Sequence, residues 1–338
     1  MTHLCRTYEE QASNIFTIHQ NGFPVPINIC LLLILIFLHP PKTMGTETDN
    51  ISAEIYEIKD SLKLLNSLTN KYLQKAAFSA NRSKVKCSDN ELRAAVWNLI
   101  GGNFYANLHK DLLKMSIFDK HLPSINQSIY QYIRFYESTL WMVELGPTIK
   151  LGNYKVGTDK IGHFIAEGWA YFTRAFLKSR SIQKAIDYGH HLELGVFGVL
   201  TMGIYSYGDL TANFNGMIFW SKLTPEFAKN SPFSGNSYFI CSNNEWVQQR
   251  TFLWEDYLDG AWSEANNCSY FRTKNIEVAI DKKIEDIETY LQSKTKTKVS
   301  LTCPFYPAEC AKAVAKYGSF SKYIIHPKCI FEGKRVLK

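Results

Sequence analysis

The 338-residue sequence has no apolar run of bilayer length. Its N-terminal run, within 27–45, offers about a dozen apolar residues before two prolines, whereas a spanning helix needs roughly 20. The run is typical of a signal-peptide core, and a retained signal anchor is the competing interpretation. Cys30 lies inside the run rather than at its end, so no lipoprotein signal is indicated. We expect a periplasmic or secreted protein, with the N-terminal segment either cleaved or kept as a membrane anchor.

The sequence also lacks the short motifs of several large enzyme classes. It contains no Gly-x-Ser-x-Gly elbow, no Walker loop, no Gly-x-Gly-x-x-Gly and no His-Glu-x-x-His. The net charge of +7 is spread along the chain rather than gathered in one basic block, so nucleic-acid binding is not expected. The shares of hydrophobic (46%) and charged (20%) residues are those of a globular protein with a sizeable core.

Cys-x-x-Cys pairs are absent, which argues against a zinc site built on cysteines. Six cysteines remain beyond residue 44, an even number that is compatible with three disulfides in an exported protein. The stretch 241–268 looks like one loop closed at its ends. We therefore expect a Cys241–Cys268 disulfide, with two bridges among Cys87, Cys303, Cys310 and Cys329.

Hydrophobic periodicity predicts a mainly α fold, a helical bundle with an irregular, disulfide-stapled C-terminal part. A heptad-like stripe predicts a helix over 51–76, and Ser88 to Glu91 form a capping box before the next helix. The remaining helices are expected at 124–146, 159–178, 182–205, 208–222 and 275–292, with a short one ended by Gly318. The expected parts of the chain are 1–44 (signal or anchor), 45–150 (helical), 151–224 (glycine-rich helical unit) and 225–338 (cysteine-containing).

Glycines and aromatic residues mark two of these parts. The glycines at 162, 168, 195, 198, 203 and 216 lower helix propensity, so their density predicts close packing of helix backbones. In the stretch 246–262, Trp246, Trp254, Tyr257 and Trp262 form either a ligand-facing wall or part of the core. The charged residues around them either belong to such a wall or are equally well explained as surface charge: Arg250, Glu255, Asp256, Asp259 and Glu264.

The residues that can carry chemistry lie in the glycine-rich unit. Asp159, His163 and Glu167 stand four residues apart, which places them on one helix face with Thr158 as a candidate cap. A carboxylate beside a histidine fixes its tautomer and raises its basicity, as a general base or a metal ligand requires. The neighbouring helices add His190 with Glu193, and Asp209 with Asn213.

Three interpretations of this set remain open. A catalytic or metal site would use His163 with the surrounding carboxylates, as bundle interiors do. Alternatively, Asp159 and Asp209 are helix N-terminal acids, His163 is a satisfied core histidine, and Asn213 is a cap or an inter-helix partner. In the third interpretation the polar residues hold the glycine-packed helices together.

"DKIGHF" at 159–164 and "YSYGDLTANFNG" at 205–216 resemble a paired pattern of VanZ-like membrane proteins and of an uncharacterised family of predicted bacterial periplasmic lipoproteins. The resemblance covers about 155–220 and implies a bacterial, envelope-associated protein. The positions that carry it are Asp159, Lys160, His163, Asp209, Asn213 and Gly216. VanZ-like proteins have several spanning helices, whereas in this chain only the N-terminal run is hydrophobic enough to be a candidate.

The sequence leaves two functions to be separated. The first is a membrane-associated hydrolase or transferase of the envelope, with His163, Asp159 and Asp209 as catalytic residues and a divalent metal as its candidate cofactor. Lys160, Glu167, Glu193 and Asn213 would then be binding residues, and the candidate metal ligands are His163, Glu167, His190 and Glu193. The second is a non-catalytic assembly or interaction protein. In both cases the partner is a membrane surface or an envelope component.

Overall fold

The structure, a computed structural model, describes residues 47–102, 105–141, 145–195, 198–229, 233, 235–296 and 299–336. They belong to one unit, Met44–Lys338. The apolar run predicted to be a signal peptide or anchor lies outside these residues. Within them, every helix is too short or too polar to cross a bilayer.

The N-terminal part of the described chain is helical. Its helices are α3 (Asn50–Ala53), α4 (Leu62–Asn81), α5 (Asp89–Ile100) and α6 (Asn107–Lys114). The side chain of Ser88 accepts a hydrogen bond from the backbone of Glu91, so the predicted start of α5 is confirmed. The helix predicted over 51–76 is present from Leu62 on as α4, but its continuity from residue 51 is wrong, since α3 ends at Ala53. The Asp60 carboxylate, just before α4, accepts the amides of Leu62 and Gly152.

A second predicted helix, over 124–146, is also wrong. Among its described residues the chain forms turns and two short 3-10 helices, Ile125–Gln127 and Thr139–Trp141. Hydroxyl side chains compete for the backbone here, since Ser128 accepts from the amide of Tyr130 and Ser138 accepts from that of Leu140. Tertiary burial of the apolar residues then decides the conformation, because Ile129, Ile133 and Leu140 belong to a second hydrophobic cluster.

A small antiparallel sheet leads the chain into the glycine-rich unit. It contains β1 (Lys120–His121), β2 (Thr148–Leu151) and β3 (Tyr154–Gly157) in that order. Thr148 pairs with Gly157 at its edge. The strand β3 ends at Gly157, so only Thr158 separates it from Asp159, the first residue of the next helix.

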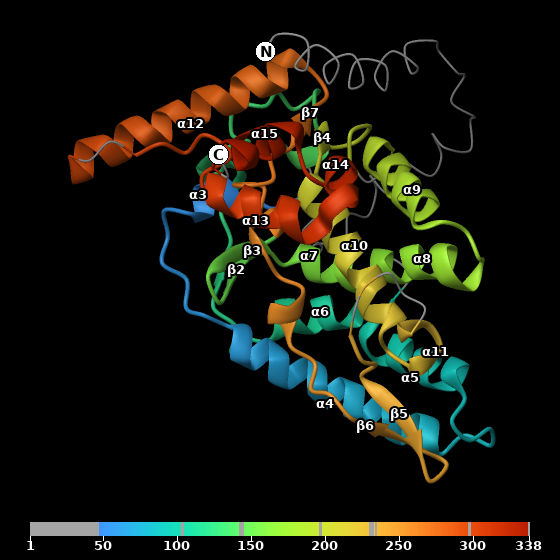
Figure 1. Cartoon of the computed structure of the whole chain (residues 1–338). Helices are drawn as coiled ribbons and strands as arrows, with labels where there is room; N and C mark the ends of the chain where they lie inside the picture. The colour runs from blue at the N-terminus through green and yellow to red at the C-terminus, as the bar shows by residue number, and fades with distance from the viewer. Residues whose placement is uncertain are drawn as a thin grey trace. The chain divides into compact units, whose positions relative to one another are not determined.

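The predicted helix over 159–178 is confirmed, with two wide turns in it. It consists of α7 (Asp159–Gly162), a π-helix (His163–Glu167), α8 (Gly168–Phe172) and a second π-helix (Thr173–Leu177). The next helix, α9 (Ile182–Leu194), ends at Gly195 and is shorter than predicted. After β4 (Ile204–Tyr205), α10 (Tyr207–Ser221) follows as predicted. Figure 1 shows α10 in yellow beside α8, with α14 (Ser321–Ile324) also packed on it.

The C-terminal part combines irregular segments with short elements. These are α11 (Pro225–Ala228), the hairpin of β5 (Phe239–Ser242) and β6 (Glu245–Gln248), β7 (Tyr270–Phe271), α12 (Lys274–Thr295), α13 (Pro307–Tyr317) and α15 (Pro327–Val336). Two 3-10 helices, Trp254–Asp256 and Gly260–Trp262, precede β7, which pairs with β4. The helix over 275–292 and the stop at Gly318 were predicted, and both are confirmed.

Three disulfides cross-link this part of the chain, one of them to the N-terminal helices and two within the part itself. They join Cys87 to Cys241, Cys268 to Cys303 and Cys310 to Cys329. The count agrees with the expectation, but the predicted Cys241–Cys268 pair is wrong, because the β5–β6 hairpin lies against α4. Three intact disulfides indicate an oxidising compartment.

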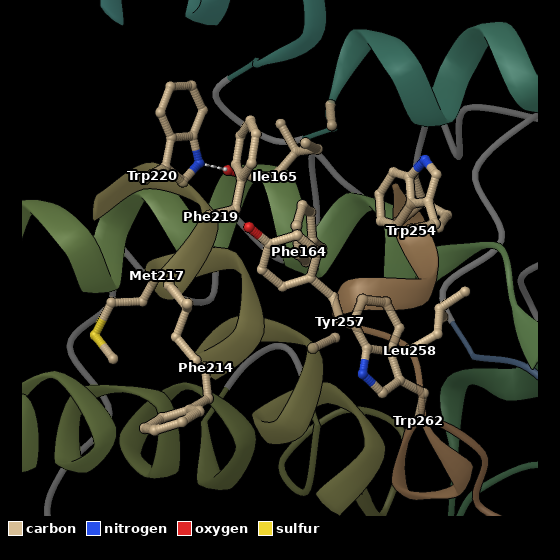
Figure 2. Close-up of a cluster of buried hydrophobic side chains, with 14 of the residues drawn as sticks. Phe164, Ile165, Phe214, Met217, Phe219, Trp220, Trp254, Tyr257, Leu258 and Trp262 are labelled. Atoms are coloured by element: carbon tan, nitrogen blue, oxygen red, sulfur yellow. Dashed lines mark hydrogen bonds between the residues drawn. The ribbon is translucent and has the colours of Figure 1, made fainter. Parts of the chain in front are cut away.

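The aromatic residues of 246–262 belong to the core rather than to a ligand-facing wall. Trp254, Tyr257 and Trp262 are buried, and their rings pack around Phe164 of the π-helix (Figure 2). The indole of Trp220 donates to the backbone oxygen of Ile165. This ring cluster fixes the π-helix from its apolar side, so its polar side chains are held against α10.

Candidate functional site

Lys160 is the centre of a buried charge cluster. Its side chain is fully buried, and its Nζ lies 2.7 Å from Asp159 Oδ2, 2.7 Å from Asp209 Oδ1 and 2.6 Å from Glu264 Oε1. The sequence left surface charge open for Glu264, and the structure excludes it, since only 5% of Glu264 is exposed. Asp259 is likewise buried and pairs with Lys316.

The start of α10 organises two of these carboxylates. Ser206 is the N-cap, and its hydroxyl oxygen accepts the amide of Asp209 at 3.1 Å while donating to Glu264 Oε1 at 2.8 Å. Gly208 leaves room for the cluster, because a Cβ atom there would stand 2.8 Å from Glu264 Oε1 and 3.0 Å from Lys160 Cε. The sequence "SYGD" therefore builds a helix cap and a charge pocket together. Thr158, the predicted cap of α7, makes no capping hydrogen bond.

The first described residues close the cluster from the other side. The Thr48 hydroxyl donates to Asp159 Oδ1 at 2.9 Å, and the Asn50 amide donates to Glu264. Glu47 is 3% exposed, and its Oε1 has no hydrogen-bond partner. Sequence reasoning missed this contribution, since no periodicity links 47–50 to the motif residues.

His163 lies at the edge of the cluster. Its Nε2 is 3.3 Å from Asp209 Oδ2, and its Nδ1 is 3.0 Å from Asn213 Oδ1 and 3.9 Å from Glu167 Oε2. The side chains of His163 and Glu167 are 21% and 25% exposed. The predicted hydrogen bond between helices at Asn213 is thus present, and the cluster reaches solvent at His163 and Glu167.

The surrounding charges set the protonation of this edge. Burial disfavours the imidazolium, but the carboxylates of Asp209 and Glu167 outweigh burial and raise the pKa of His163 to about 9. Burial, with the Asp209 carboxylate next, raises the pKa of Glu193 to about 8. The Lys160 ammonium overcomes burial to lower the pKa of Asp159. At neutral pH His163 is therefore charged and Glu193 is largely neutral.

The structure brings most of the predicted site residues together. Glu193 is 3% exposed and its Oε2 accepts the amide of Ser206 at 3.3 Å, beside the cluster. His190 is not part of the cluster, because its Nδ1 is hydrogen-bonded to the Tyr205 hydroxyl. Burial lowers the pKa of His190 to about 4. Sequence reasoning missed His109 of α6, a buried imidazole close enough to feel the charges of Asp159 and His163.

Three side chains of the described residues offer ligand atoms to a single metal ion. The ligand atoms of Asp159, His163 and Asp209 all lie within 4.8 Å of one another. Of the four predicted candidate ligands, His163 alone belongs to this set. Comparison of the chain with protein-family models, curated proteins and solved structures finds no match.

Proposed function

We propose that the chain is an envelope hydrolase or transferase whose reaction centre is formed by Asp159, His163 and Asp209. The observation that carries the proposal is the position of His163. Its imidazole is fixed between Asp209 and Asn213, at 3.3 and 3.0 Å, yet is 21% exposed. A substrate group arriving from solvent therefore meets an oriented ring backed by a buried carboxylate, which supports a centre that stabilises developing charge.

Glu167 supplies the second function that hydrolysis needs. Its carboxylate is 3.9 Å from His163 Nδ1 and partly exposed, and burial raises its pKa above the ordinary value. A carboxylate of raised pKa beside a cationic centre accepts a proton from water at neutral pH. In this proposal Glu167 activates the attacking water or acceptor hydroxyl, while the His163 centre stabilises the charge that develops on the substrate.

The substrate class follows from the compartment and from the paired motif. Three disulfides place the described chain in an oxidising compartment. The resemblance to envelope proteins of the VanZ-like kind favours lipid or cell-wall material as substrate. An N-terminal signal peptide or anchor and attachment to a membrane surface are parts of the same proposal.

The test is a hydrolase screen of the purified full chain with ester, phosphodiester and amide probes. We expect turnover on one class, and a fall of roughly 10²–10⁴-fold in kcat for Glu167→Gln. Glu285→Gln, on the exposed face of α12, is the matched control and should keep full activity. Turnover by no probe class, or an unchanged rate in Glu167→Gln, contradicts the proposal.

One observation favours the second function, a non-catalytic assembly protein. Lys160 is sealed among three carboxylates with no exposed surface, which is an arrangement that also serves packing specificity. In that case Lys160 variants lose stability, whereas Glu167 variants leave every cellular and chemical readout unchanged. Comparing the two variants in one envelope-integrity assay separates the functions.

A further inference from the structure

The hydrogen-bond partners of His163 leave its Nε2 atom available to bind a cation. Nδ1 lies 3.0 Å from Asn213 Oδ1, an amide oxygen that only accepts hydrogen bonds, so Nδ1 carries a proton. A metal ion displaces the second proton of the imidazolium, and Nε2 then presents a lone pair. It faces Asp209 Oδ2 at 3.3 Å, which is longer than the 2.7–2.9 Å of a charge-assisted hydrogen bond. Two acceptor atoms at this separation fit a cation shared between them.

The buried charges around this position do not balance. Asp159, Asp209 and Glu264 surround the single ammonium of Lys160. Glu47 is a fourth buried carboxyl group, and burial raises its pKa well above the ordinary value, so it adds no full charge. The remaining carboxylates need a counter-charge, since an unpaired charge in the interior is strongly unfavourable. A divalent cation bound in place of the proton on His163 Nε2 would, together with Lys160, balance three carboxylates.

We propose that Asp159, His163 and Asp209 bind a first-row divalent metal ion of the zinc class. Their ligand atoms lie within 4.8 Å of one another. Ligands at 2.0–2.2 Å from a tetrahedral zinc stand roughly 3.3–3.5 Å apart, which agrees with the 3.3 Å between His163 Nε2 and Asp209 Oδ2. One imidazole with two carboxylates suits zinc or manganese better than calcium.

Neighbouring residues complete the arrangement. Asn213 holds Nδ1–H and so points the Nε2 lone pair toward Asp209, as outer-shell partners of ligand histidines do. Lys160 pairs with Asp159 Oδ2 and Asp209 Oδ1, which leaves Asp209 Oδ2 turned toward His163. Exposure at His163 and Glu167 leaves one side for a water molecule or a substrate. The ion's part in turnover rests on the proposed function, whereas its binding does not.

The experiment is a zinc titration of the full chain after treatment with a chelator. Elemental analysis should find one zinc ion per chain after gel filtration. At a hundredfold excess of zinc over its Kd, the Tm should rise by roughly 5 °C. His163→Gln and Asp209→Asn should each weaken binding at least a hundredfold. His190→Gln is the matched control, because His190 is hydrogen-bonded to Tyr205 outside the set, and should bind as the wild type does.

Two outcomes overturn the metal site. One is a wild-type chain that retains well under one zinc and shows no Tm shift, and the other is a His190→Gln variant that loses as much affinity as His163→Gln. If Asp209→Asn does not fold, Asn213→Ala replaces it, with an expected loss of roughly 10–100-fold in zinc affinity. Zinc binding without turnover refutes the proposed function alone. Turnover that persists in the metal-free chain refutes the ion's part in turnover alone.

Discussion

Gly168 and Gly216 face each other where α8 crosses α10, and a Cβ atom on Gly168 would lie 2.5 Å from the Cα atom of Gly216. Both belong to the glycines expected to pack closely, and here two helix backbones come into contact. This contact sets how near Asn213 and Asp209 of α10 come to His163. The glycines of this unit therefore allow the close helix packing that positions the charge cluster.

This crossing predicts the sign of a substitution. Alanine normally stabilises a helix relative to glycine by up to about 1 kcal/mol. At Gly216 a Cβ atom would stand 1.9 Å from the backbone oxygen of Phe164, so Gly216→Ala should instead destabilise the protein by about 1–3 kcal/mol. Urea unfolding measures the change. A Gly216→Ala protein as stable as the wild type would show that the helices do not cross at this distance.

Lys160→Met should be strongly destabilising in the metal-free chain. It leaves Asp159, Asp209 and Glu264 buried without their ammonium, and removing one partner of a buried ion pair costs about 3–5 kcal/mol. The deficit should shrink as the pH falls, because the carboxylates become protonated. Lys274→Met, in an exposed pair with Glu277, is the control and should unfold as the wild type does. Equal urea midpoints for the two variants would contradict the role given to Lys160.

The burial of His326 predicts that the free energy of unfolding falls in acid. Burial lowers its pKa from 6.5 to about 3, and its Nδ1 accepts the amide of Lys328 at the start of α15. In the unfolded chain the His326 side chain is protonated below pH 6.5, whereas in the folded chain it is protonated only below about pH 3. The stabilisation is therefore complete above pH 6.5 and decreases by about 1.4 kcal/mol per pH unit below it.

His326→Asn keeps a side-chain acceptor for that amide and removes the titration. Urea unfolding at pH 7, 6, 5 and 4 should show a shallower acid dependence for the variant, by about 1.4 kcal/mol per pH unit. His109 and His190, whose pKa values burial also lowers, keep part of the dependence in both proteins. Parallel curves for variant and wild type would show that His326 is not buried as a neutral ring.

The disulfide pattern can be read directly by peptide mapping without reductant. We expect a linked peptide containing Cys87 and Cys241, residues separated by 154 positions. Replacing both with serine should cost about 2–5 kcal/mol of stability. A peptide linking Cys241 to Cys268 would instead support the pairing expected from sequence and overturn the observed one.

Local signals predicted the fold where the chain carries them. Ser88 caps α5, and Gly318 ends α13, because capping depends on residues adjacent in sequence. Thr69, which interrupts the apolar stripe of α4, was not explained by the sequence. Its hydroxyl donates to Leu65 and accepts the indole N–H of Trp254, so a polar residue was needed inside the helix packing.

Spacing likewise recovered only part of the site. It identified Asp159, His163 and Glu167, which share a helix face, and Asp209, which stands four residues before Asn213. The paired motif added Lys160. Glu264 and the segment 47–50 join them through irregular chain, where no periodicity reports which side chains turn inward. The π-helix His163–Glu167 has no reliable sequence signal either, because it results from tertiary packing against α10.

The contact between Asn50 and Glu264 joins residues that are 214 positions apart, and Thr48 meets Asp159 across 111. Contacts so distant along the chain make folding slow, since loop closure is unfavourable until both ends are in place. During synthesis the segment 47–50 emerges first and finds its partner only when most of the chain has followed. The charge cluster is therefore complete only after Glu264 has been synthesised, and any chain that stops before Glu264 leaves Lys160 without one of its three carboxylates.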